Sequence, residues 1–282
     1  MEKPLTRYIA AYDTENPVEC LRACAKIRAV HEKFAFPATF FILGERLEQE
    51  GAEYRVVLGN CDLFEIASHT YSHQPLRDHP FCGPAVVPEE RVKEVRLGKQ
   101  WVEDTFSRAC VGMRPGCGFA DALRGDPWLL GEIQSAGFGY VSSQLWGPET
   151  TLPALLERPF AYSDDGFPDL WEMPAHGWHE NVLKAHNLST STQRLLAWPM
   201  PDPDLLLPGP IHTVEEEFAV NRLFIDRAVR DGLPYVSLIW HPWSLERFDP
   251  PLRMLELTFA YVQELGLEVS TFQAEWERVR NV

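Results

Sequence analysis

Short apolar runs alternate with amphipathic segments along nearly the whole chain of 282 residues. The first apolar run, 7–12, is followed by helical apolar spacing over 18–33 and by a second run at 37–44. A strand, a helix and a strand in this order form a parallel crossover. Because the alternation continues to the end of the chain, we predict an α/β fold in which a single domain, 1–282, forms one parallel, barrel-like sheet.

The same pattern predicts the remaining elements. Strands are expected at 63–68, 109–113, 138–143, 170–174, 235–240 and 267–269, and helices at 88–106, 127–136, 214–230 and 251–265. One segment interrupts the alternation, because residues 176–212 are rich in proline. We predict that this segment is a loop excursion over the barrel mouth that shapes the substrate site, with a passive surface loop as the alternative.

The acidic composition limits the classes of partner. The formal net charge is −15 at pH 7 and the pI is about 5.0. Binding to nucleic acid or to an anionic membrane needs a basic face, so we expect neither as the main partner. The chain has no uncharged apolar run of about 18 residues, and its first residues lack the features of a signal peptide. We therefore predict a cytoplasmic protein.

Six cysteines are sparse for a chain of this length, and none forms a Cys-x-x-Cys pair. Disulfide frameworks are typical of short secreted chains, so we predict free thiols. Cys20 and Cys24 fall on the apolar side of the predicted helix 18–33, which favours burial over metal binding.

Polar side chains that could carry chemistry follow the carboxyl ends of several predicted strands. His69 and His73 come after strand 63–68, and their spacing allows both imidazoles to reach one metal ion. Because the carboxyl ends of parallel strands meet on one face of a barrel, we expect the polar residues there to lie close together. The candidates are Asp13, Glu15, His69, His73, Arg114 and His241.

The order of these motifs resembles the polysaccharide deacetylase family, the carbohydrate esterases with the NodB-homology domain. The matching segments are 11–13, 38–44, 68–73, 114–118 and 238–242, and the resemblance spans 7–270. It implies a distorted, incomplete (β/α) barrel with about seven parallel strands. It also implies a hydrolase that removes an N-acetyl or related acyl group from an amino sugar or small glycoconjugate, with a small molecule or oligosaccharide as substrate.

The resemblance further implies a role for each site residue. A divalent metal, with zinc as the first choice and cobalt or nickel as alternatives, would be held by the two histidines and one carboxylate. The implied metal ligands are Glu15, His69 and His73. The implied catalytic residues are Asp13 as general base, Arg114 as its partner and His241 as general acid. The implied substrate-binding groups are the backbone N–H near Cys117 and the ring of Trp171.

Two departures from the family pattern leave alternatives open. Thr14 stands where the family usually has a second aspartate, so either Glu15 or Asp13 is the carboxylate ligand, or the metal is weak or absent. Gly116 stands where many members have a further proline, which predicts a more flexible loop. Because Thr14 replaces the second aspartate, a metal-independent hydrolase of cyclic amides such as allantoin is an alternative function. A non-catalytic carbohydrate-binding barrel is a third possible function.

Overall fold

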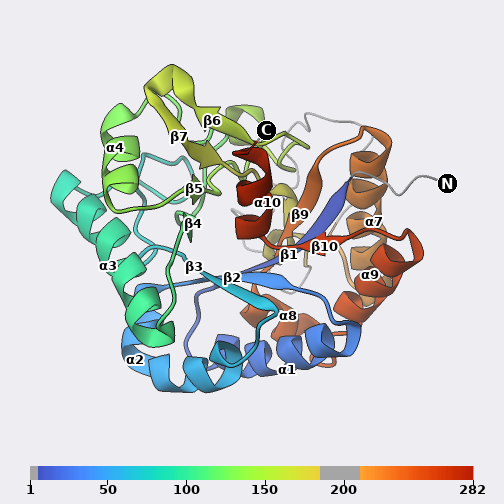
Figure 1. The fold of residues 1–282 in the computed structure, drawn as a ribbon. Helices are drawn as coiled ribbons and strands as arrows, with labels where there is room; N and C mark the ends of the chain where they lie inside the picture. Colours follow the sequence, from blue (N-terminus) through green and yellow to red (C-terminus); the bar gives the residue numbers. More distant parts are fainter. Residues whose placement is uncertain (1–5, 185–209, 282) are drawn as a thin grey trace.

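The computed structural model describes residues 6–184 and 210–281, which form an α/β fold around an open, curled sheet (Figure 1). The strand order is β6-β7-β5-β4-β3-β2-β1-β9-β8, with β10 paired to β1. All neighbouring strands are parallel except β6 and β7. The sheet is therefore a half-barrel of mostly parallel strands, and the predicted fold class is confirmed.

The described chain contains the following elements. The strands are β1 (Arg7–Thr14), β2 (Ala38–Ile42), β3 (Phe64–Ser68), β4 (Gly112–Met113), β5 (Tyr140–Val141), β6 (Phe160–Tyr162), β7 (Phe167–Glu172), β8 (His176–His179), β9 (Tyr235–Ile239) and β10 (Val269–Ser270). The α-helices are α1 (Glu19–Phe34), α2 (Gly44–Tyr54), α3 (Pro88–Phe106), α4 (Pro127–Ser135), α5 (Glu180–Leu183), α7 (Val214–Arg230), α8 (Pro242–Phe248), α9 (Arg253–Glu264) and α10 (Phe272–Val279).

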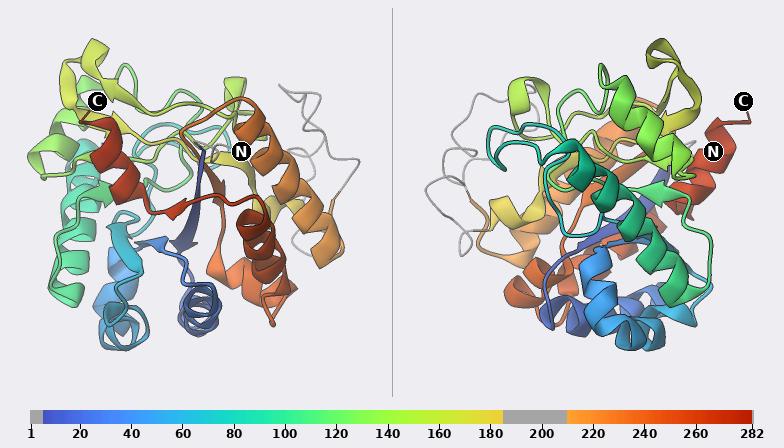
Figure 2. Two further views of the ribbon diagram at one scale, coloured as in Figure 1. Left: turned by 45° about the vertical axis from the view of Figure 1, so that its right-hand side comes forward. Right: turned by 90° about the vertical axis from the view of Figure 1, so that its left-hand side faces the viewer.

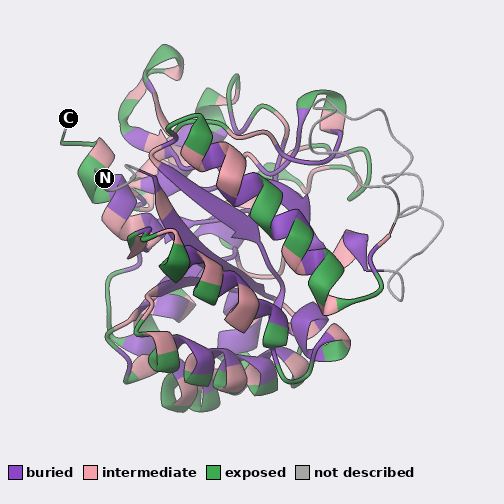
Figure 3. Cartoon of the chain, turned by 90° about the vertical axis from the view of Figure 1, so that its right-hand side faces the viewer, coloured by how far each residue is buried: buried purple, intermediate pink, exposed green. Residues whose placement is uncertain are grey.

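Helices cover the outer side of the sheet, and their exposed residues face away from it (Figures 2 and 3). Strand β1 shows how the two sides of the sheet divide. Tyr8 and Tyr12 belong to the large cluster shared with the outer helices, whereas Ile9 and Ala11 belong to the smaller cluster inside the half-barrel. Because side chains alternate along a strand, Asp13 follows Ile9 and Ala11 to the inner side.

The interior of the half-barrel is closed at the amino end of the strands by α10. Phe272 and Trp276 of this helix pack in the inner cluster with residues of β1, β2 and β5, and Figure 1 shows α10 across the centre of the sheet. Within the described residues, this apolar plug fills the amino end of the half-barrel, and the carboxyl ends of the strands stay open. Among the described residues, no helix is both long and apolar enough to cross a bilayer.

The predicted loop excursion over 176–212 is wrong in its first part. Residues 176–183 form β8 and α5, because β8 pairs in parallel with β9. Residues 185–209, on which the predicted lid depends, lie outside the described residues. The strand was not predicted because it is only four residues long and stands in a proline-rich context.

Candidate active site

Two residues with positive φ lie in the turn that orients His69 and His73. Strand β3 ends at Ser68, and the next turn contains Thr70 and His73, each with φ 65°. The His69 Nδ1–H donates to the carbonyl oxygen of Arg114 at 2.8 Å, since a carbonyl can only accept. This bond fixes the tautomer and leaves the His69 Nε2 free to act as a ligand. The two imidazole rings lie 5.0 Å apart between centroids.

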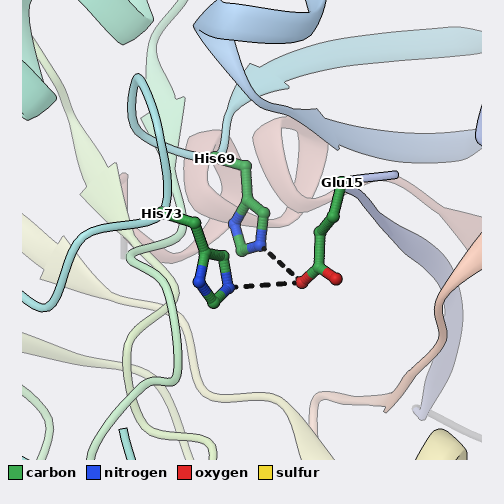
Figure 4. Close-up of side chains that lie close together, drawn as sticks. All are labelled: Glu15, His69 and His73. Carbon is green, nitrogen blue, oxygen red and sulfur yellow. Dashed lines mark hydrogen bonds and ion pairs between the residues drawn. The ribbon is translucent and has the colours of Figure 1, made fainter. Parts of the chain in front are cut away.

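Glu15 completes the group. Its Oε1 lies 3.3 Å from Nε2 of His69 and 3.2 Å from Nε2 of His73, and both rings turn toward it (Figure 4). One potential ligand atom from each of the three residues lies within 4.8 Å of the others. Two imidazole nitrogens and one carboxylate oxygen form a donor set that suits zinc and leaves a position for water. The residues therefore fit a divalent metal, and the geometry favours Glu15 over Asp13 as the carboxylate ligand.

Asp13 is paired with a buried arginine. Arg114 Nη1 donates to Asp13 Oδ1 at 2.7 Å, and its Nη2 donates to Ser142 Oγ at 3.0 Å. The guanidinium stacks over Phe41 at 4.2 Å. Burial raises the pKa of Asp13, but the charges of Arg114 and nearby histidines outweigh burial and hold this pKa below its usual value. Asp13 is thus ionised at neutral pH and able to accept a proton.

His241 approaches the same group from β9. Its Nδ1 lies 3.2 Å from Oε1 of Glu180, and its Nε2 lies 3.7 Å from Oε1 of Glu15. Burial lowers the pKa of His241, but the carboxylates of Glu15 and Glu180 outweigh it and raise this pKa to about 9. The imidazole is therefore protonated at neutral pH, with Nε2 on the side of Glu15.

A cavity of about 240 Å³ opens beside these side chains. Its non-catalytic wall is largely apolar, and Phe81 stacks on Trp146 with the ring centroids 5.5 Å apart and the planes at 13°. The cavity is lined by Asp13, Glu15, His69, His73, Phe81, Cys82, Cys117, Leu145, Trp146, His179, Asn181, Val182 and His241. A cavity of this size and lining suits one small ring or acyl group with a flat apolar face.

Two cysteines in this wall are bonded to each other. The disulfide joins Cys82 to Cys117, whereas Cys20, Cys24, Cys61 and Cys110 are free and buried. The prediction of free thiols is therefore wrong for this pair. The two residues are 35 positions apart, and only the packing of the loop after β3 against the loop after β4 brings them together. The burial predicted for the two cysteines of α1 is confirmed.

Trp171 does not line the cavity. It lies in β7 and packs against the cluster inside the half-barrel, near Tyr140 and α10. The prediction of a sugar platform at this position is therefore corrected, because the ring packs against the inner cluster and lies outside the cavity lining. The cavity has Trp146 as its aromatic wall instead, and that residue lies in an irregular segment after β5.

Sequence reasoning missed Glu180, which holds His241 through its backbone N–H at 2.8 Å as well as through Nδ1. Glu180 follows the carboxyl end of β8, as Glu15 follows that of β1. The same strand-end rule would have identified it if the four-residue strand had been predicted. Phe81 and Asn181 were missed because they lie in loops or short elements with no periodic pattern.

A comparison with known protein families matches residues 17–125 to the family described as "Polysaccharide deacetylase". The matched segment contains the histidine pair and Arg114, and the half-barrel has the expected architecture. Residues 17–125 are thus similar to the polysaccharide deacetylase family. This match supports a deacetylase-type hydrolase, although it begins after Asp13 and Glu15 and ends before His241.

Solved structures support the fold of this family. A structure from Mycobacterium smegmatis assigned to the polysaccharide deacetylases has a TM-score of 0.65 at 18% identity, and the alignment covers 100% of this chain and 93% of that one. Puue allantoinase also has a TM-score of 0.65, at 12% identity, with 97% and 90% covered. A CE4 family pseudoenzyme from Bacillus anthracis has a TM-score of 0.53 at 11% identity, with 97% and 66% covered. The comparison with curated proteins found no match.

Proposed function

We propose that this chain is a metal-dependent hydrolase that removes an N-acetyl or related acyl group from an amino sugar or small glycoconjugate. The observation that carries the proposal is the meeting of Glu15, His69 and His73 within 4.8 Å, between the Asp13–Arg114 pair and His241. Zinc is the metal we expect, with cobalt or nickel as alternatives. When bound, such an ion supplies a more acidic water and polarises the scissile carbonyl.

The chain's own side chains would move the protons. Asp13, kept ionised by Arg114, takes the proton of the attacking water. His241, whose Nδ1 faces Glu180, presents Nε2 and gives its proton to the departing nitrogen. Within the described residues the backbone N–H of Cys117 donates no hydrogen bond, so it is available to the developing oxyanion. The stacked rings of Phe81 and Trp146 line the same cavity and would pack against the acyl group.

A second candidate is a metal-independent hydrolase of cyclic amides. The fold similarity to Puue allantoinase and the small volume of the cavity favour it. Against it stands the orientation of both imidazoles toward Glu15, which a reaction without metal would not need. The two candidates differ in their dependence on a bound ion.

The deciding experiment measures metal content and hydrolysis on the same preparation. The purified chain is analysed by mass spectrometry for bound metal and assayed for acetate release from a panel of N-acetyl sugars, with and without chelator. We expect about one ion per chain and activity that chelator removes and zinc restores. Glu15→Gln should lose the ion, whereas Glu53→Gln at an exposed position should keep it. Ring opening of allantoin without metal, and no acetate release, would replace the proposal with the second candidate.

A further inference from the structure

A fully buried lysine lies behind the proposed acid. Lys184 follows α5, and its ammonium lies 2.6 Å from Oε2 of Glu180 and 3.5 Å from Oε1 of Glu217 on α7. All three side chains are at most 3% exposed. The shorter contact makes Glu180 the principal partner of Lys184, and the ring of Phe248 lies 5.0 Å from the ammonium.

Stability alone does not account for this cation. The removal of an ion pair from water costs several kcal/mol per ion, and apolar replacements of similar volume are often equally stable. Burial lowers the pKa of Lys184, but Glu180 and Glu217 outweigh it and keep the lysine charged. A buried charge that is maintained beside a proposed catalytic group needs a reason in the chemistry.

The two oxygens of Glu180 divide their partners between the lysine and the histidine. Oε1 accepts from the backbone N–H of His241 at 2.8 Å and faces its Nδ1 at 3.2 Å. Oε2 accepts from Lys184 at 2.6 Å and from Ser244 Oγ at 2.8 Å. The lysine thus fixes Oε2 of Glu180. Because the carboxylate group is rigid, the position of Oε1 is fixed as well. Lys184, Glu180 and His241 form one continuous chain of contacts that ends at the cavity.

We propose that Lys184 is a positioning residue that acts through Glu180 to hold the imidazole of His241 with Nε2 toward the departing nitrogen. This inference rests on the proposed function, in which His241 supplies the proton for that nitrogen. Without Lys184, Glu180 has no full cation at Oε2, and its carboxylate can turn away from Nδ1 or take up a proton. In either case the orientation of His241 is lost.

Such a role predicts a defect that depends on the leaving group. An amide nitrogen must be protonated as it departs, whereas a nitrophenolate departs without a proton. Loss of Lys184 should therefore slow amide hydrolysis and leave hydrolysis of an activated ester nearly unchanged. A lysine that only stabilises the fold would affect both reactions equally.

The test compares 4-nitroacetanilide with 4-nitrophenyl acetate, which share the acyl group and the aryl ring. For Lys184→Met in the zinc-loaded protein we expect kcat for the anilide to fall about 10- to 100-fold, and kcat for the ester to stay within about threefold. Lys33→Met removes an exposed lysine that pairs with Glu256 and should change neither rate. An equal loss on both substrates overturns the inference and leaves the proposed function intact.

Two further measurements keep the inference testable if the single variant folds poorly or the wild type turns over neither probe. The double variant Lys184→Met/Glu217→Gln removes one charge of each sign, and we expect it to fold and to retain the amide-selective defect. In the metal-free wild type, the proton on His241 Nδ1 should give a downfield NMR resonance, which is identified by its loss in Glu180→Gln. This resonance should shift or broaden when Lys184 is replaced. An unchanged resonance overturns the inference, whereas absence of turnover together with the shifted resonance counts against the proposed function alone.

Discussion

Two carboxylates, the partly exposed Glu15 and the fully buried Glu172, have contrasting partners. Glu172 accepts hydrogen bonds from Ser143 N at 2.7 Å, Ser143 Oγ at 2.6 Å, Gln144 N at 2.9 Å and Tyr162 OH at 2.5 Å. All of these donors are neutral, and Glu172 does not line the cavity. Glu15 faces two imidazoles and the Trp243 N–H at 3.2 Å, on the wall of the cavity.

The pKa values follow the same division. Burial raises the pKa of Glu172, and the neutral hydrogen bonds do not outweigh this effect. Burial also raises the pKa of Glu15, but His241 and the bonds to His69 and His73 outweigh it, so this pKa lies well below its usual value. The comparison teaches that burial by itself does not mark a reactive carboxylate. Partners that titrate, and access to a cavity, distinguish the site from the scaffold.

The largest expected effect concerns the site side of this comparison. Asp13→Asn keeps an acceptor for Arg114 but removes the base, so kcat for acetate release should fall about 10³- to 10⁴-fold, or about 4 to 5.5 kcal/mol in the barrier. The thermal midpoint, measured in parallel, should change little by comparison. Asp62→Asn at an exposed position is the control. A variant that retains a tenth or more of the wild-type kcat would contradict the assignment of Asp13 as base.

The next effect concerns the scaffold side. Glu172→Leu leaves the backbone N–H groups of Ser143 and Gln144 buried without an acceptor, which should lower the free energy of unfolding by about 3 to 4 kcal/mol. The kcat of the folded protein should stay within about twofold. Urea denaturation and acetate release measure the two quantities, with Glu53→Leu as an exposed control. If the variant lost activity and kept its stability, the division between site and scaffold would be wrong.

His31 extends the comparison to histidines. It accepts from Tyr12 OH at 2.7 Å and its Nδ1–H donates to Phe36 O at 2.8 Å, and burial lowers its pKa to about 4. The unfolded chain binds this proton with a pKa of about 6.5, so between pH 6.5 and 4 the unfolded state holds more protons and stability falls as pH falls.

The expected loss from His31 is up to about 3 kcal/mol across that window. The free energy of unfolding, measured by urea denaturation at several pH values, should depend less steeply on pH in His31→Gln than in the wild type. His241, whose pKa is raised, should not contribute a loss in this window. Identical pH slopes for the variant and the wild type would contradict the neutral state of His31.

The smallest expected effect concerns the wall of the cavity. Cys82→Ser removes the disulfide to Cys117 and frees the segment that carries Phe81. We expect KM to rise about fivefold, which is about 1 kcal/mol, with little change in kcat. Cys61→Ser, at a buried free thiol away from the cavity, should leave KM unchanged. Chemical reduction of the disulfide in the wild type should raise KM by a similar factor. If neither the substitution nor the reduction changes KM, the disulfide has no role in substrate binding.

The sequence predicted long periodic elements better than short ones. The bounds of α3 and α7 agree with those predicted, because Pro88 stands in the first turn of one and a Thr213–Glu216 capping box begins the other. Strand β8 and helix α8 were missed, since four and seven residues carry too little periodicity. Helices α2 and α10, of 11 and 8 residues, were not predicted either.

The site divides in the same way. The strand-end residues Asp13, Glu15, His69 and His241 could be identified because a parallel sheet brings its carboxyl ends together. Glu180 depends on the pairing of β8 with β9, and the Cys82–Cys117 disulfide depends on two loops that pack together. Neither arrangement is visible in local sequence. The error at Trp171 has a related cause, since local sequence does not show how β7 packs against the inner cluster.

Gly116 has a consequence for any attempt to improve this chain by borrowing from its relatives. A Cβ atom at this position would lie 2.8 Å from Cγ and Nδ1 of His73, so the missing side chain provides room for the imidazole rather than slack in the loop. A proline at this position would displace that ring. A redesign should therefore leave this glycine unchanged, because the substitution that ordinarily rigidifies a loop would here displace the imidazole of His73.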